Sequence, residues 1–209
     1  MLAVNAGSGT SVNFQGVQYQ GDTYATGGSL NSTNDPIAGV SEDALFQSER
    51  YGTYSYQVPV SEAFYTVDLH FVELFWNATG QRSFSVSVEG TPVLSNMDLF
   101  AQVGHDTAFS TRVEDIFVND GNLSINLTTQ VDNATLSGFA IYSEDGELVE
   151  APPPVSGASA EFSGADCAIP TLPSPGAVGN QGAGLPDPFR SLNGSRITTA
   201  EQWRCRRAF

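Results

Sequence analysis

Apolar and polar residues alternate through most of the first 150 residues of this chain. The alternation is clearest in three runs, at residues 65–71, 84–88 and 123–127. In the first run one face carries Tyr65, Val67, Leu69 and Phe71, and the opposite face carries Thr66, Asp68 and His70. A period of two is typical of a strand that is buried on one face and wet on the other. These runs therefore predict half-buried strands.

Turn signals separate such runs, and no stretch of a dozen residues shows a clean helical period. Asn119-Asp120-Gly121 lies between two of them, and Gly121 readily takes the positive φ that a tight hairpin needs. Tyr54 and Tyr56 are two residues apart, so we expect them to pack within a sheet. Many short strands joined by Gly and Asn turns favour an all-β fold, an antiparallel β-sandwich of jelly-roll-like type.

Three motifs in the first 150 residues resemble those of malectin-like carbohydrate-binding modules, in the same order and spacing. They are AVNAGSG at Ala3–Gly9, LFQSERYG at Leu45–Gly52 and MDLFAQVGH at Met97–His105. The resemblance covers residues 3–149. It implies a β-sandwich that binds glucose-containing oligosaccharides without transforming them, and it places the first strand at Leu2–Ala6.

The composition changes after Glu150. Residues 151–166 are rich in Pro, Ser and Ala, and we expect a linker there because such a segment cannot bury enough apolar surface to fold alone. Residues 167–209 resemble the N-terminal segment of fungal glucuronoyl esterases. That resemblance rests on Cys167 and on the runs LPDPF at 185–189, ITT at 197–199 and WRCRR at 203–207. It implies a largely irregular tail that ends where a catalytic α/β-hydrolase core would begin.

The only two cysteines are Cys167 and Cys205. In a secreted protein an even pair suggests a disulfide, and this one would close a loop of about 38 residues, worth up to about 4 kcal/mol. The esterase resemblance implies the same pairing. The alternative is two unrelated free thiols.

Charge divides the chain at the same place. The first 150 residues hold 19 of the 23 acidic residues but only three basic ones, Arg50, Arg82 and Arg112, and lysine is absent from the whole sequence. A domain this acidic is repelled by phosphate backbones and anionic lipid surfaces, so we expect no nucleic acid or membrane partner. A neutral sugar is indifferent to that charge. We expect a monomer, tethered to a catalytic domain in a longer parent protein.

Secretion is suggested by N-glycosylation sequons. Six of them begin at Asn31, Asn77, Asn122, Asn126, Asn133 and Asn193. No run of 18 apolar residues predicts a transmembrane helix, and the start MLAVNAGSG lacks the regions of a signal peptide. We therefore expect an extracellular protein whose natural N-terminus precedes this sequence.

Sugar binding needs aromatic faces for the C–H side of a pyranose and fixed polar groups for its hydroxyls. The malectin resemblance assigns these roles to Tyr51, Phe75, Trp76 and Asp132, and with a less similar surrounding loop to Tyr24. The adjacent pair is usually Tyr and Phe in that family. The Phe and Trp found here predict a larger stacking surface and less selectivity for one disaccharide.

The backbone around these residues supports the assignment. Consecutive residues of a strand point to opposite faces, but at a strand end both Phe75 and Trp76 can face a ligand. Core packing explains Phe75 equally well. We expect Glu49 and Arg50 to form structural hydrogen bonds or an ion pair that holds the loop of Tyr51.

Catalytic and metal sites have weak signals. Glu73, Asp68 and Asp98 are candidates for a glycosidase pair, but nothing in their spacing selects them. His70 and His105 lack the close spacing of zinc ligands, and no spaced Asp motif marks a calcium site, although loop carboxylates leave that alternative open. No G-x-S-x-G motif is present, and no histidine follows His105. We expect neither an enzyme in these residues nor a cofactor.

Four functions remain open. The first is a weak binding module, with micromolar to millimolar dissociation constants, that targets an attached enzyme to plant cell wall glycan. The second is an incomplete secreted glucuronoyl esterase, which would cleave esters between lignin and glucuronoxylan. The third is a luminal reader of glucosylated N-glycans. The fourth is a structural spacer, which would require Tyr51 and Trp76 to be buried.

Overall fold

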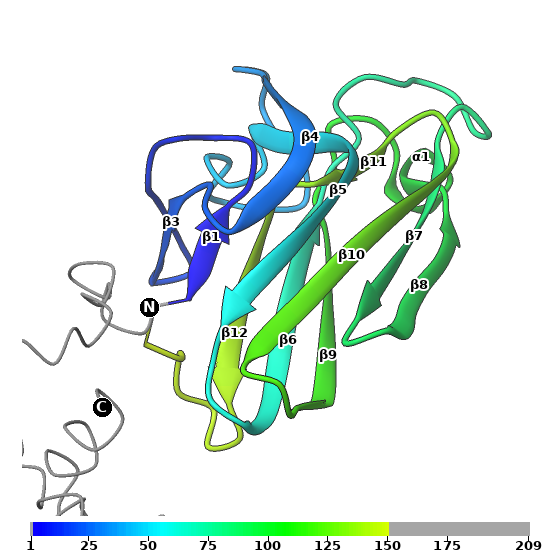
Figure 1. Ribbon diagram of the computed structural model, residues 1–209. Helices are drawn as coiled ribbons and strands as arrows, with labels where there is room; N and C mark the ends of the chain where they lie inside the picture. Colours follow the sequence, from blue (N-terminus) through cyan, green and yellow to red (C-terminus); the bar gives the residue numbers. More distant parts are fainter. Residues whose placement is uncertain (1, 151–209) are drawn as a thin grey trace, which may run out of the picture. The chain divides into compact units, whose positions relative to one another are not determined.

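The computed structural model describes residues 2–150, which fold into two β-sheets that face each other (Figure 1). This confirms the antiparallel β-sandwich predicted from the alternation. Residue 1 and residues 151–209 lie outside the described part, and with them the predicted linker and esterase-like segment, Cys167, Cys205 and Asn193. Those predictions stay predictions.

The described residues form twelve strands and one short helix. In chain order they are β1 (Ala3–Asn5), β2 (Val12–Phe14), β3 (Val17–Gly21), β4 (Ala25–Ser32), β5 (Ser48–Pro59), β6 (Ala63–Phe71), β7 (Ser83–Val88), β8 (Thr91–Met97), α1 (Leu99–Val103), β9 (Phe109–Val118), β10 (Asn122–Val131), β11 (Ala134–Leu136) and β12 (Gly138–Ser143). The three alternating runs lie in β6, β7 and β10. No helix within residues 2–150 is long and apolar enough to span a membrane.

The strands form one sheet in the order β2-β3-β1-β12-β6-β9 and a second in the order β11-β5-β10-β7-β8, where β4 also pairs with β5. Neighbouring strands are antiparallel except for β1 and β3. On one edge of β5, residues 50–52 pair with β11 and residues 54–59 pair with β10. β4 lies along the other edge. One long strand therefore links most of the second sheet.

The core between the sheets is built from the predicted apolar faces. Every apolar residue of the three alternating runs is buried in it. Tyr54 and Tyr56 are only 4% and 0% exposed, as expected for sheet packing. The Tyr56 ring meets the Phe139 ring edge-on, with centroids 4.8 Å apart. The turn at Gly121 (φ 84°) separates β9 from β10, as predicted.

A second, smaller core covers the outer face of β6, and the sequence pattern did not predict it. His70 is 4% exposed although it lies on the face expected to be wet. The rings of Phe14, Tyr19 and Phe46, which come from the β2–β3 hairpin and the turn before β5, pack edge-on around it. Its two ring nitrogens lie 2.8 Å from the Tyr19 hydroxyl and 2.8 Å from Ser110 Oγ.

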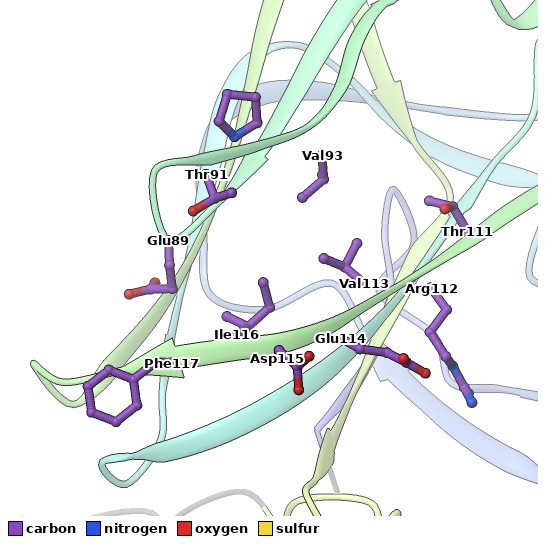
Figure 2. Close-up of a pocket in the computed structure, with 11 residues that line it drawn as sticks. Glu89, Thr91, Val93, Thr111, Arg112, Val113, Glu114, Asp115, Ile116 and Phe117 are labelled. Carbon is purple, nitrogen blue, oxygen red and sulfur yellow. The ribbon is translucent and has the colours of Figure 1, made fainter.

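The sandwich is open at one side, between the edge strands β8 and β9. A cleft of about 520 Å³ lies there, and Figure 2 shows Val93, Val113 and Ile116 pointing into it. Glu89 and Glu114 contribute carboxylates to its lining. None of the sugar-binding residues predicted from the sequence lines this cleft.

The buried imidazole predicts an acid-sensitive fold. Burial lowers the pKa of His70 from 6.5 to about 4. Between these values the unfolded chain takes up a proton that the folded protein excludes, so the free energy of unfolding should fall by up to about 3 kcal/mol as the pH drops from 6.5 to 4. Urea unfolding across this range should show a steeper pH dependence for the native protein than for His70→Gln. Parallel curves for the two proteins would contradict this account.

Candidate functional site

The candidate site is organised by residues 72–82, the loop that crosses from β6 in one sheet to β7 in the other. Glu73, the second residue of this loop, is fully buried. Its Oε1 accepts the backbone N–H of Phe75 at 3.0 Å and that of Trp76 at 2.9 Å. One carboxylate therefore fixes the backbone of both aromatic residues.

Arg82, at the other end of this loop, neutralises Glu73. Its Nε lies 2.6 Å from Oε2 and its Nη2 lies 3.1 Å from Oε1, a two-point contact between side chains that are 4% and 0% exposed. Its Nη1 donates to the Asn133 carbonyl at 2.7 Å. Charge-assisted two-point pairs are geometrically specific, and removing one partner of a buried pair is costly. The pair thus closes the loop and anchors it to the turn between β10 and β11.

Phe75 and Trp76 form an exposed aromatic pair. Their ring centroids are 4.8 Å apart at an interplanar angle of 87°, and Phe75 is 66% exposed while Trp76 is half-buried. β6 ends four residues before Phe75, at Phe71, so the alternation of a strand does not apply to the pair. Phe75 is not a core residue, because its ring stands largely in solvent.

Asp132 holds the Trp76 indole. Its Oδ2 accepts the Trp76 Nε1–H at 2.9 Å and lies 3.9 Å from Arg82 Nη1, and its Oδ1 accepts from the Asn133 side chain at 2.9 Å. Asp132 has a φ of 55°, in the left-handed region that Asp and Asn tolerate better than most residues. The aspartate therefore shapes both the turn and the orientation of the indole.

Tyr51 lies in β5, so the expectation that it stands on a loop was wrong. Its register partners are Ser29 in β4 and Thr135 in β11. Thr135 is two residues beyond Asn133, which brings Tyr51 to the same turn as Asp132. Tyr51 falls within the strand because β4 and β11 pair with this part of β5 on its two edges. Tyr51 is half-buried rather than buried.

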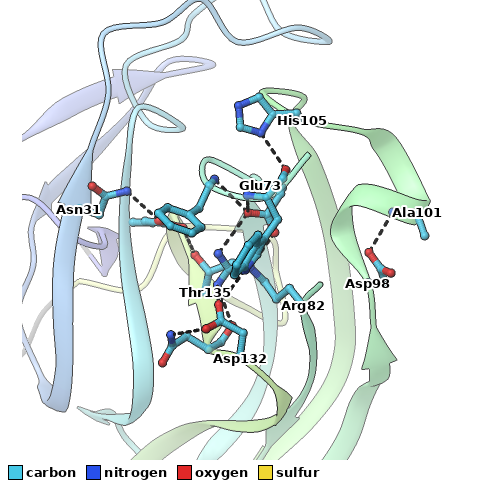
Figure 3. Close-up of polar contacts among 12 residues, drawn as sticks. Asn31, Glu73, Arg82, Asp98, Ala101, His105, Asp132 and Thr135 are labelled. Atoms are coloured by element: carbon cyan, nitrogen blue, oxygen red, sulfur yellow. Dashed lines mark hydrogen bonds and ion pairs between the residues drawn. The ribbon is translucent and has the colours of Figure 1, made fainter. Parts of the chain in front are cut away.

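Glu49 forms a second buried contact beside this turn. Its Oε1 accepts from Asn31 Nδ2 at 2.9 Å, and its Oε2 accepts from the Thr135 hydroxyl. Burial raises the pKa of Glu49. Figure 3 shows Asn31, Thr135, Glu73, Arg82 and Asp132 gathered in one polar cluster.

Glu49 and Arg50 make structural contacts, as expected, but with separate partners and not with each other. Arg50 Nε donates to Asp22 Oδ2 at 2.8 Å, and its Nη1 donates to the Gly27 carbonyl. Asp22 also accepts from the Tyr56 hydroxyl at 2.9 Å. Neighbouring side chains of a strand point to opposite faces, which explains why the two charges diverge.

Tyr24 is the one predicted aromatic residue that the structure does not bring to this cluster. Its carbonyl accepts from the Gln57 N–H at 3.1 Å. Gln57 lies six residues beyond Tyr51 along β5, which corresponds to about 20 Å of strand. The Tyr24 side chain is half-buried against the main core.

The MDLFAQVGH motif supports the aromatic loop from the other side. Asp98 caps α1 through Oδ1 and accepts the Gly80 N–H through Oδ2 at 2.6 Å. His105 Nδ1 lies 3.0 Å from the Trp76 carbonyl. These contacts give the motif a structural role, in holding the loop between Trp76 and Gly80.

The three carboxylates considered for a glycosidase are engaged in separate contacts. Glu73 is buried against Arg82, Asp98 caps a helix, and Asp68 accepts from Arg112 at 2.7 Å through both oxygens. Among residues 2–150, no group of three or more His, Cys, Asp or Glu side chains could hold a metal ion.

Sequence reasoning did not assign Arg82, Asn31 or Thr135 to the site. Arg82 carried a usable signal, because it is one of only three basic residues in the first 150 and directly precedes an apolar strand. The contacts of Asn31 and Thr135 with Glu49 join residues 18 and 86 positions apart, which no local pattern reveals.

The predicted sequons are partly drawn into the same cluster. Asn31 and Asn133 donate side-chain hydrogen bonds to Glu49 and Asp132, whereas Asn77 is exposed beside Trp76. Asn122 and Asn126 lie half-buried in β10.

Comparison with known proteins identifies relatives of this domain. The family model described as Malectin domain matches residues 1–148. Malectin-B of Xenopus laevis is 31% identical over 135 residues, which is 60% of this chain and 48% of that protein. The chain thus spans about half the length of the curated relatives it matches.

Solved structures share the fold at low sequence identity. Bacteroides uniformis beta-glucuronidase superimposes with a TM-score of 0.60 at 19% identity, over 68% of this chain and 18% of that one. The plant receptor-like kinase FER gives a TM-score of 0.58 at 17% identity, over 72% of this chain and 52% of that one.

The buried pair yields a stability prediction. Arg82→Met should lower the free energy of unfolding by about 3–5 kcal/mol, because it leaves the Glu73 carboxylate buried without a counter-charge. Adding Glu73→Leu to Arg82→Met should restore much of the loss. The control is Arg112→Met, since the Arg112 side chain is 55% exposed and water can replace its contact with Asp68, so the loss should be smaller. Equal losses at both arginines, measured by urea unfolding, would show that the buried pair has no special role.

Proposed function

The chain belongs to the malectin-domain family, and on that premise we propose that the surface formed by Tyr51, Phe75, Trp76 and Asp132 binds glucose-containing oligo- or polysaccharides without transforming them. The observation that carries the proposal is the exposed Phe75–Trp76 pair, held by Glu73 and Asp132. Contiguous exposed apolar surface marks interaction sites in soluble proteins, and the two adjacent rings form such a surface.

The pair suits a sugar because it is already ordered. Both backbone amides and the indole N–H are hydrogen-bonded within the protein, so little conformational entropy remains to be lost on binding. The aromatic faces supply area for the apolar side of a pyranose, and the neighbouring Asp132 and Tyr51 supply polar groups for its hydroxyls. Tyr24 is left out of the proposed surface because it directly precedes β4 and its carbonyl is bonded to Gln57, six residues along β5 from Tyr51.

The affinity should be modest. Two stacked rings contribute roughly 1–2 kcal/mol each by analogy with base stacking, and each hydrogen bond adds about 1 kcal/mol net. Association costs at least about 4 kcal/mol. Dissociation constants between micromolar and millimolar follow. Such a module acts by raising the local concentration of whatever is attached to it.

For the longer parent protein we propose an extracellular targeting role. Residues 151–166 would serve as a linker and residues 167–209 as the start of a glucuronoyl-esterase-like catalytic domain, with Cys167 and Cys205 joined. The module would then hold an esterase near plant cell wall polysaccharide. The motifs in residues 185–207 support this arrangement.

The alternative function for the same surface is recognition of glucosylated N-glycans in the secretory lumen. It predicts a preference for a short glucose oligosaccharide over every polymer. The exposed Phe75 and the larger Trp76 ring favour the polymer, because two rings at an angle of 87° offer separate faces to neighbouring sugar units.

A binding screen tests the proposal. The chain should bind at least one of a set comprising glucose disaccharides, mixed-linkage β-glucan, xyloglucan, starch and glucuronoxylan. Tyr51→Ala and Trp76→Ala should each remove binding, and Trp76→Ala should change the melting temperature by only a few degrees, because the ring is half-buried outside the core. The control is Phe117→Ala, which removes a 45% exposed ring that packs on Phe64 instead. Native affinity in the Trp76→Ala variant would refute the proposed surface.

The bond between Trp76 and Asp132 can be tested separately by a double-mutant cycle. Trp76→Phe keeps a ring but removes the indole N–H, and Asp132→Gly removes the acceptor while tolerating the left-handed backbone. If Asp132 acts by orienting the indole, the two changes should be coupled by about 1 kcal/mol, roughly fivefold in dissociation constant. Strictly additive effects in calorimetric titrations would mean that Asp132 acts on the sugar by itself.

A further inference from the structure

Every arginine in residues 2–150 already faces a carboxylate. The pairs are Arg50 with Asp22 at 2.8 Å, Arg82 with Glu73 at 2.6 Å and Arg112 with Asp68 at 2.7 Å. Lysine does not occur in the sequence. His105, the histidine beside the aromatic loop, has its Nδ1 at 3.0 Å from the Trp76 carbonyl and its Nε2 at 3.4 Å from Asp106.

Among residues 2–150, the proposed sugar surface therefore carries negative charge and no arginine that lacks a carboxylate partner. Arg82 is the cation closest to Asp132 among the contacts of this cluster, and its charge is balanced by the two-point contact with Glu73. Its remaining contacts are with the Asn133 carbonyl and, at 3.9 Å, with Asp132. The side chain of Asp132 is 30% exposed, so its carboxylate is felt by a ligand that lies on the Trp76 ring.

A ligand carboxylate at this surface would meet two penalties. It would lie within the screening length of Asp132, about 10 Å at 0.1 M salt. It would also lose part of its hydration without gaining a free cationic partner from residues 2–150. The 19 acidic residues of the first 150 add a long-range repulsion that salt also weakens. A neutral sugar meets neither penalty. A protonated amino sugar is attracted by the same carboxylates, which should strengthen its binding.

We propose that this surface selects neutral and cationic sugars and rejects uronates, that is, sugars carrying a carboxylate. The inference rests on the proposed sugar-binding function and specifies its substrate class. In a cell wall polymer that mixes neutral and acidic units, the module would anchor on the neutral stretches and leave the uronate residues uncovered.

Three matched disaccharides test the proposal on the full chain. The first is the glucose disaccharide selected by the screen, and in the other two its terminal glucose is replaced by glucuronic acid or by glucosamine. In calorimetric titrations at about 20 mM salt the uronate should bind at least about tenfold more weakly than the neutral sugar, and the amino sugar equally or more tightly. At about 500 mM salt these differences should shrink, because exposed charges are then screened.

Charge variants locate the effect. Asp132→Asn keeps an acceptor for the indole and a residue that tolerates the left-handed backbone. It should reduce the factor by which the neutral sugar binds more tightly than the uronate. Glu62→Gln removes the same charge from an exposed position between β5 and β6, away from the cluster, and should leave the ratio unchanged.

The outcomes separate the two proposals. Uronate binding within twofold of neutral binding would overturn the charge selection and leave the sugar-binding function intact. If Glu62→Gln reduced the ratio of neutral to uronate affinity as much as Asp132→Asn does, the selection would not originate at Asp132. If the native chain bound none of the three disaccharides and no polymer in the screen, the proposed function itself would be overturned.

Discussion

The surface on which the proposed function rests depends on one buried ion pair. Glu73 and Arg82 lie at the two ends of the loop that joins the sheets, and their contact closes it. Glu73 also fixes the two amides of the aromatic residues, and Arg82 also reaches the β10–β11 turn. A buried pair of this kind costs desolvation and does not by itself stabilise a fold. Its contribution here is geometric, because it sets where two aromatic rings stand.

The sequence predicted what depends on local period and missed what depends on distant partners. Alternation was enough for β6, β7 and β10, since a half-buried strand shows it directly. It failed at His70, because the rings that cover that side chain come from the β2–β3 hairpin and the turn before β5. The family resemblance was enough to predict Trp76 and Asp132 as site residues. Their hydrogen bond joins residues 56 positions apart, so no local pattern reveals it.

The length of β5 explains why Tyr51 and Tyr24 lie far apart. A single 12-residue strand carries Glu49 and Tyr51 at its beginning, and the carbonyl of Tyr24 is bonded to Gln57 near its end. Two residues that the family resemblance assigned to one site are thus separated by half the length of a strand. The same strand presents Tyr54 and Tyr56 to the core, so Tyr51 belongs to a strand that is anchored by buried side chains.

The left-handed backbone at Asp132 limits how this surface can diverge during evolution. A φ of 55° is strained for most residues with a side chain, and glycine or asparagine are the replacements that avoid the strain. Neither brings a positive charge. In a descendant that bound acidic polysaccharide, a cation at this position would carry the backbone strain as well. A new arginine in the exposed segment at residues 77–80, where Asp98 holds the Gly80 amide, would avoid that strain.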